Sequence, residues 1–71
     1  MAREFGTVKF FNAKEGWGFL TSGASTQDIF VHYQTIRGTG YKVLREGQKV
    51  TFELVRHEKG PRATDVEVVR H

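Results

Sequence analysis

The chain has 71 residues, enough for one domain with a modest core, and its lack of cysteine excludes disulfide bonds and a cysteine-ligated zinc site. Eleven lysine and arginine residues outnumber eight aspartate and glutamate residues, and the net charge of +3 fits a polyanionic partner and an ordinary solvated surface equally well. No apolar run approaches the roughly 20 residues that span a bilayer and no N-terminal secretory signal is present, so we expect one cytoplasmic domain, residues 1–71, without a membrane partner.

Short predicted strands alternate with turns along the chain, and no segment places apolar residues at helical spacing over ten positions. The predicted strands cover residues 5–12, 17–22, 28–33, 49–55 and 63–69. The turns contain asparagine or glycine, as in NAKEG after the first strand. Residues 34–47 are predicted to form a loop with at most one helical turn, near Thr35 and Ile36. This pattern predicts an all-β fold, a small closed or nearly closed barrel.

The second and third predicted strands carry large rings on the face opposite their core residues. Alternate residues of a strand point to opposite faces, so Trp17 and Phe19 lie opposite Leu20. In the third strand, Phe30 and His32 likewise lie opposite two β-branched residues. If these strands are antiparallel neighbours, the four rings form one outer cluster, which a chain of 71 residues cannot cover with a second layer.

The first predicted strand is ambiguous, because two adjacent phenylalanines follow Val8 and Lys9. Strict alternation places only one of Phe10 and Phe11 outside, whereas a β-bulge would bring both to the rim. In the second strand, Gly18 on the inner face suits a barrel, since a strand needs room to coil sharply there.

An uncovered aromatic surface has three interpretations. Rings on an open sheet can stack on unpaired bases, at about 1–3 kcal/mol per base, while basic residues at the margins hold phosphates. The candidate basic residues are Lys9, Lys14, Arg37, Lys42, Lys59 and Arg62. The alternatives are a dimer interface and a peptide groove of the kind found in SH3 domains.

Catalysis and metal binding find no support in the sequence. There is no thiol nucleophile, and the three histidines, His32, His57 and His71, are scattered without metal-ligand spacing. The GWG of residues 16–18 is not a dinucleotide fingerprint, since the third glycine and the following helix are missing. We therefore expect a binding protein, not an enzyme, without metal, cofactor or small-molecule substrate.

Several motifs carry a close resemblance to a known family. GTVKFFNAKEGWGFLTS (residues 6–22) followed by DIFVHYQTI (28–36) resembles the cold-shock proteins, the bacterial single-domain members of the cold-shock domain family. EGQKVTF (46–52) and KGPRA (59–63) match the later part of the family pattern in order. The resemblance therefore covers essentially the whole chain.

The resemblance implies a five-stranded antiparallel barrel like the OB-fold. It implies a protein that binds single-stranded RNA and DNA with low sequence specificity and acts as an ATP-independent RNA chaperone that melts weak secondary structure. We expect a monomer, although the sequence leaves the oligomeric state open. Some members of the family relieve transcription termination or act in the cold-shock response.

Carried over position by position, the resemblance also implies the site. The predicted nucleic-acid-binding residues are Lys9, Phe10, Trp17, Phe19, Phe30, His32, Tyr33, Tyr41, Lys59 and Arg62. Strict alternation after Val31 places Tyr33 inside, so its place in the site requires an irregularity at the end of the third strand. The resemblance leaves open whether Phe11 is exposed or partly buried.

The chain departs from the family pattern at four positions. Phe10 stands where the family usually has Trp, and Trp17 where Phe or Tyr is commoner. Glu15 stands where a Lys is usual, which reverses the charge at an expected phosphate contact. Arg62 replaces a common Gln, and we expect it to restore a positive charge.

Overall fold

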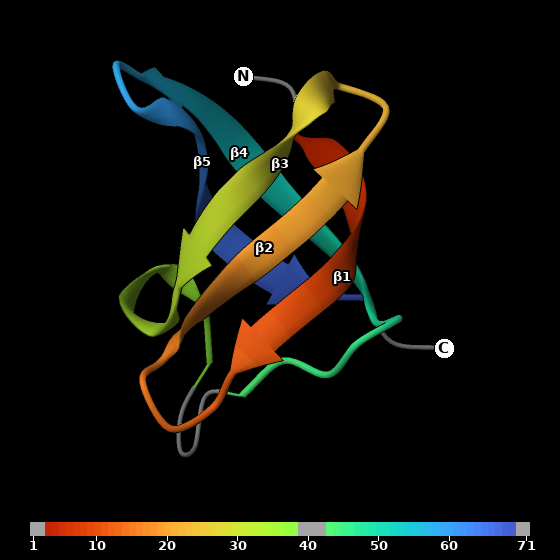
Figure 1. Ribbon diagram of the computed structural model, residues 1–71. Coiled ribbons are helices and arrows are strands. Elements are labelled where there is room, and N and C mark those ends of the chain that lie inside the picture. Colours follow the sequence, from red (N-terminus) through yellow and green to blue (C-terminus); the bar gives the residue numbers. More distant parts are fainter. Residues whose placement is uncertain (1–2, 39–42, 70–71) are drawn as a thin grey trace.

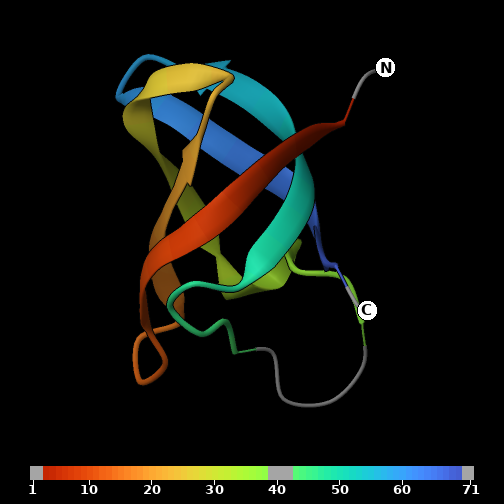
Figure 2. The ribbon, with the colours of Figure 1, turned by 90° about the vertical axis from the view of Figure 1, so that its right-hand side faces the viewer.

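A computed structural model describes residues 3–38 and 43–69, and within these ranges five strands close into a barrel (Figure 1). The strands are β1 (Glu4–Asn12), β2 (Trp17–Ser22), β3 (Ser25–His32), β4 (Lys49–His57) and β5 (Gly60–Val68). A single turn of 3-10 helix, η1 (Tyr33–Thr35), follows β3. Around the barrel the order is β1-β2-β3-β5-β4, and β4 runs beside β1 to close it (Figure 2).

All five predicted strands are present, and the helical turn of the long loop is η1. The predicted bounds of β2 are those observed. β4 and β5 extend further toward their shared turn than predicted, because the β4–β5 ladder continues to the pair His57 and Gly60, with only two residues in the turn. A two-residue turn leaves no room for the loop that the sequence suggested there. β3 begins earlier than predicted, at Ser25, which pairs with Ser22 of β2.

One pair of neighbouring strands is parallel in a barrel that is otherwise antiparallel. β3 and β5 run in the same direction, with Phe30 opposite Arg62, and Ile36 and Val66 form an isolated parallel bridge beyond them. A closed ring with an odd number of strands cannot alternate direction at every junction. The parallel junction therefore follows from closing five strands into one barrel.

Each strand contributes to one apolar core inside the barrel. The buried residues are Val8, Leu20, Ile29, Val31, Ile36, Leu44, Val50, Phe52, Ala63 and Val66. Phe52 is the largest of the fully buried side chains, and the described residues include no buried polar side chain. The predicted inward positions of the second and third strands are thus confirmed.

Gly18 lies on the inner face of β2, where the backbone of β1 approaches closely. A Cβ at this position would collide with the carbonyl oxygen of Phe10 and would lie 2.7 Å from the Cα of Phe11. Only glycine permits this approach. The close contact lets β1 and β2 coil around the core, as their place in a small barrel requires.

A β-bulge in β1 decides how the two adjacent phenylalanines point. Val8 pairs with Leu20 and Phe10 pairs with Phe19, so Lys9 is the extra residue between them. As a result Lys9 and Phe10 are both exposed on the outer face, and Phe11 packs against the core, partly buried. Without the bulge, Val8 and Phe10 would share the inner face.

Candidate functional site

The outer face of the barrel carries a row of rings that the strand register aligns. Phe10 on β1 faces Phe19 on β2, and Phe19 faces Phe30 on β3. Beyond the parallel junction, Phe30 is opposite Arg62, which in turn faces Val55 on β4. Phe19, Phe30 and Arg62 each lie between buried residues of their own strand and therefore point outward, and Phe10 and Val55 are exposed as well.

Trp17 lies one step along the strands from this row and contacts all three of its rings. Its ring centroid is 5.8 Å from that of Phe10 and 6.0 Å from that of Phe19, both in edge-to-face geometry. The Phe30 ring lies 6.4 Å away at an interplanar angle of only 23°. These distances are those of favourable aromatic pairs, so Trp17 holds the cluster together while its ring stays only partly buried.

His32 and Tyr33 extend the ring surface at the end of β3. The strand ends at His32, and Tyr33 begins η1 with 43% of its surface exposed. The two rings lie 4.6 Å apart. The backbone N–H of Gln34 donates to His32 Nδ1 at 3.2 Å, which assigns the ring proton to Nε2, the nitrogen left available to a ligand. The predicted irregularity at the end of the third strand is therefore present.

We call these six side chains the aromatic surface: Phe10, Trp17, Phe19, Phe30, His32 and Tyr33. Tyr41, which was expected to approach from the loop, lies outside the described residues, as does Lys42.

Gly16 fixes the position of Tyr33, a role that was not foreseen from the sequence. Gly16 has a φ of +80°, and a Cβ there would lie 2.5 Å from Tyr33 Cδ1. Its N–H donates to the Asn12 carbonyl at 2.7 Å, and its carbonyl accepts from the Tyr33 N–H at 2.8 Å. Gly16 thus closes the β1–β2 turn and packs directly against the Tyr33 ring. A glycine at the end of a hairpin turn was the only sequence signal available for this role.

Glu15 makes a contact with the aromatic surface instead of leaving a gap in it. Its Oε1 accepts a hydrogen bond from Trp17 Nε1 at 3.1 Å. Its own backbone N–H donates to Asn12 Oδ1 at 3.0 Å, which holds the residue in the turn. The carboxylate therefore lies beside the indole and contacts it. From the family resemblance alone, Glu15 indicated only the loss of a phosphate contact.

The described basic residues divide into a first group that is paired with carboxylates or lies in a turn, and a second group that lines a groove beside the rings. Lys9 Nζ lies 2.7 Å from Asp28 Oδ2, and Arg37 lies 3.2 Å from Asp65 Oδ1, so both are already paired with carboxylates. Lys14 is exposed in the β1–β2 turn. Arg37 in addition contacts Glu67 on β5, and this ion pairing does not bring it to the aromatic surface.

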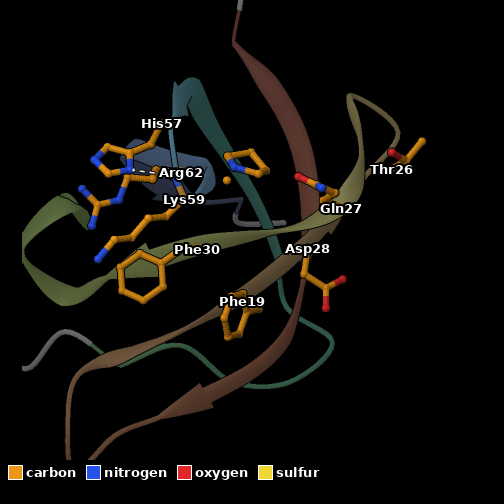
Figure 3. Close-up of a pocket in the computed structure, with 10 residues that line it drawn as sticks. Phe19, Thr26, Gln27, Asp28, Phe30, His57, Lys59 and Arg62 are labelled. Carbon is orange, nitrogen blue, oxygen red and sulfur yellow. Dashed lines mark hydrogen bonds between the residues drawn. The ribbon is translucent and has the colours of Figure 1, made fainter.

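Lys59 and Arg62 belong to the second group, and both line a groove at the edge of the aromatic surface. The groove has a volume of about 680 Å³ and Phe19 and Phe30 contribute to its lining. Figure 3 shows His57, Lys59 and Arg62 on one side of these rings. The polar residues on the other side are Thr26, Gln27 and Asp28.

Arg62 is tied directly to the aromatic surface. Its guanidinium carbon lies 5.3 Å from the centre of the Phe30 ring, which is the geometry of a cation–π contact. A guanidinium in this position can accept a stacked base on its free plane and can donate to a phosphate with its edge. Of the predicted cations, Arg62 is therefore the one best placed to serve a ligand that lies on the rings.

Two kinds of feature are absent from the part of the chain that the structure describes. No three His, Asp or Glu side chains gather there as a metal site would require. Within the same residues, no helix has the length and apolar character needed to cross a bilayer.

Comparisons with known proteins agree on one family. The family described as the 'Cold-shock' DNA-binding domain matches residues 4–69. The major cold shock protein CspA of Pseudomonas aeruginosa is 52% identical over 67 residues, which cover 94% of this chain and 96% of that protein. The cold shock-like protein CspC of Escherichia coli is 45% identical over 69 residues, covering 97% and 100% respectively.

A solved structure supports the fold independently. Drosophila Unr CSD456 matches 97% of this chain with a TM-score of 0.79 at 23% sequence identity. This chain spans 27% of the length of that larger one, so the likeness concerns a single barrel within it.

Proposed function

This chain belongs to the cold-shock domain family, whose members bind nucleic acid, and from that premise we propose that it binds single-stranded RNA and DNA on the aromatic surface. The observation that carries the proposal is the register that aligns Phe10, Phe19 and Phe30 across three strands, with Trp17 in contact with all of them. Bases stack on such rings whatever their sequence, because every base has a π-face. We therefore expect only a slight preference, toward T- or U-rich strands.

The proposed mechanism is a shift of equilibrium from paired to unpaired strands. A base that is paired within a duplex cannot offer its face to the rings, so the protein binds single strands and leaves duplexes free. Binding to the unpaired form alone draws the equilibrium toward it by mass action, without ATP. On this basis the protein acts as an RNA chaperone that opens weak hairpins, in transcription antitermination or the cold-shock response.

Phosphates in this arrangement face outward and meet the cations at the margins. Lys59 and Arg62 line the groove beside Phe30 and supply positive charge there. Lys9 supplies less, because Asp28 already neutralises it. We propose a cytoplasmic monomer that needs no cofactor and no small-molecule substrate, so these side chains alone bind the ligand.

Fluorescence of Trp17, the only tryptophan, tests the binding directly. Titration with a T-rich hexanucleotide at low salt should quench the emission, and the affinity should fall as salt rises, with a slope of about −0.7 for each phosphate contact. The duplex form of the same sequence is the control and should bind far more weakly. An emission unchanged by the hexanucleotide would contradict base stacking on this surface.

The same titration distinguishes base stacking from the two alternative uses of the rings, a peptide groove and a dimer interface. A peptide groove or a dimer interface would give no quenching by an oligonucleotide, and a dimer would show a concentration-dependent mass in sedimentation. Chaperone activity needs a separate assay, in which a fluorophore and quencher close an RNA hairpin. We expect the hairpin to open without ATP when the protein is present in an amount comparable to that of the RNA. Binding without opening would mean that the protein binds single strands but is not a chaperone.

A further inference from the structure

The indole of Trp17 is the part of the aromatic surface most dependent on a single polar contact. Its ring meets those of Phe10, Phe19 and Phe30, so its orientation sets the shape of the whole cluster. An indole has one hydrogen-bonding group, the Nε1–H, and in this structure that group donates to Glu15 Oε1 at 3.1 Å.

Glu15 is itself held by the turn from which it projects. Its N–H donates to Asn12 Oδ1, and the next N–H, that of Gly16, donates to the Asn12 carbonyl at 2.7 Å. Asn12 is also the residue that pairs with Trp17 in the β1–β2 ladder. The backbones of Glu15 and Trp17 are thus both held by Asn12, so the hairpin brings the carboxylate and the indole close together.

The contact lies near solvent in the free protein, where water competes with it. A base stacked on the indole would remove part of that water, and the hydrogen bond would then strengthen with the ligand in place. Holding the ring beforehand also reduces the conformational entropy lost on binding, which is the usual benefit of a preorganised site.

The carboxylate adds a negative charge at one end of the binding surface. The β1–β2 turn that bears Glu15 and the β4–β5 turn that bears Lys59 lie at opposite ends of the barrel (Figure 1). Phosphate is therefore disfavoured near Trp17 and favoured near Lys59 and Arg62, which line the groove at the other end. The neighbouring Lys14 is exposed in the same turn.

We propose that Glu15 is a positioning residue that fixes the Trp17 indole for stacking and, through its charge, keeps phosphates away from the β1–β2 turn. The proposal rests on the proposed binding of single strands and adds to it a division of labour: the turn end of the surface binds bases only, and the groove end binds phosphates.

Three variants separate the two effects. Glu15→Gln removes the charge and keeps a carbonyl oxygen that can accept from the indole. Glu15→Ala removes both, so its comparison with Glu15→Gln isolates the positioning. Glu15→Lys places a cation where the carboxylate was and cannot accept from the indole.

The first readout uses the free protein and needs no ligand. The NMR signal of the Trp17 Nε1–H should keep its hydrogen-bonded shift and slow solvent exchange in Glu15→Gln, and should move and exchange faster in Glu15→Ala. An indole signal that is the same in all variants would overturn the positioning role, whatever the protein binds.

The second readout is the affinity for the T-rich hexanucleotide as a function of salt. Loss of one immobilised side chain corresponds to about a two- to tenfold change, so Glu15→Ala should bind weaker than Glu15→Gln by about that factor. Glu15→Gln should bind tighter than the wild type at low salt, and the two should converge at high salt. Glu15→Lys should steepen the salt slope by about 0.7, the value of one added phosphate contact.

Equal affinities of Glu15→Gln and Glu15→Ala would overturn the positioning role in binding. Parallel salt curves of wild type, Glu15→Gln and Glu15→Lys would overturn the exclusion of phosphate. If the wild type binds no single strand at all, the proposed function fails instead, and the NMR readout still reports on the contact between Glu15 and Trp17.

Discussion

Ile29 and Phe30 are adjacent on β3 and point to opposite faces, which allows the core and the binding surface to be tested by neighbouring substitutions. Ile29 is fully buried, whereas Phe30 is only partly buried among the outer rings. Phe30→Ala should weaken binding of a T-rich hexanucleotide by roughly 1–3 kcal/mol, because one stacking ring is lost. Its urea transition should stay cooperative and two-state.

Ile29→Ala is the matched control for this substitution. It should cost about 2–5 kcal/mol of the free energy of unfolding, since it leaves a cavity in the core, while the folded fraction retains its affinity. An unfolded Phe30→Ala protein, or one with wild-type affinity, would show that Phe30 serves the core and not the ligand.

Gly16 joins a turn and a ring at a single residue. Gly16→Ala places a side chain at a φ of +80°, which costs roughly 1–2 kcal/mol, and also pushes the Tyr33 ring away. We expect a lower urea midpoint together with weaker binding. Gly23→Ala is the control, because an added Cβ there has no neighbour within 4 Å, and it should leave both measurements nearly unchanged. Equal effects of the two substitutions would contradict the role given to Gly16.

At the scale of the strands, another irregularity lies between β4 and β5, where Asp65 has a φ of 52°. Thr51 faces Glu67 and Glu53 faces Thr64, so the bulge leaves Asp65 unpaired in the ladder. The carboxylate accepts from Arg3 Nη1 at 2.9 Å and from Arg37 Nε at 3.2 Å. This residue therefore ties the first strand and the segment after η1 to β5.

Substitution of Asp65 can separate the backbone effect from the ion pairs. Asp65→Ala should lower the free energy of unfolding by about 1–2 kcal/mol, because it loses both ion pairs and tolerates the positive φ poorly. Asp65→Asn should recover part of this loss, since Asn adopts such a φ more readily. The remaining difference between Asp and Asn should shrink in 1 M salt, where the ion pairs are screened. Urea midpoints of the wild type and both variants, at low and high salt, measure these differences in stability. If Asp65→Asn is as unstable as Asp65→Ala, the positive φ at this position does not contribute to the loss.

Alternation along β2 and β3 was enough to predict which side chains of these strands lie in the core and which lie on the aromatic surface, because the strands are regular where the rings lie. It placed Tyr33 inside, because it does not foresee that β3 ends at His32. It was not enough in β1, where the bulge at Lys9 reverses the faces of Phe10 and Phe11. A bulge depends on how β1 closes against β2, and the local sequence does not encode that closure by itself.

The charged residues were less predictable than the rings. Lys9 meets Asp28, and Arg37 meets Asp65, partners that lie far apart in the sequence and are brought together only by the barrel. The contact of Glu15 with Trp17 spans two residues, but it depends on the twist of the turn. Motifs could therefore place a cation near the site without showing which cations remain available to a phosphate.

At the scale of the whole molecule, the core and the aromatic surface are opposite faces of the same strands, so binding should be linked to folding. A single-stranded ligand that binds only the folded barrel stabilises it, by about 2.7 kcal/mol at 100 times its Kd. Thermal unfolding followed by circular dichroism should shift upward with a T-rich oligonucleotide and much less with the matching duplex. Phe30→Ala should show a smaller shift at the same ligand concentration, and equal shifts with single strand and duplex would contradict the proposed selectivity.

The odd number of strands leaves the barrel with one parallel junction, between β3 and β5, and few of its residues pair in register. β4 and β5 are paired along most of their length, whereas β3 and β5 meet in register only at Phe30 and Arg62, apart from the bridge of Ile36 to Val66. This junction is where the closed sheet should open first in local fluctuations. An oligonucleotide that contacts both Phe30 and Arg62 would bridge β3 and β5. Its binding should therefore slow amide exchange at this junction more than in the β4–β5 ladder. The bound oligonucleotide would then hold the β3–β5 junction closed, in addition to being the ligand of the protein.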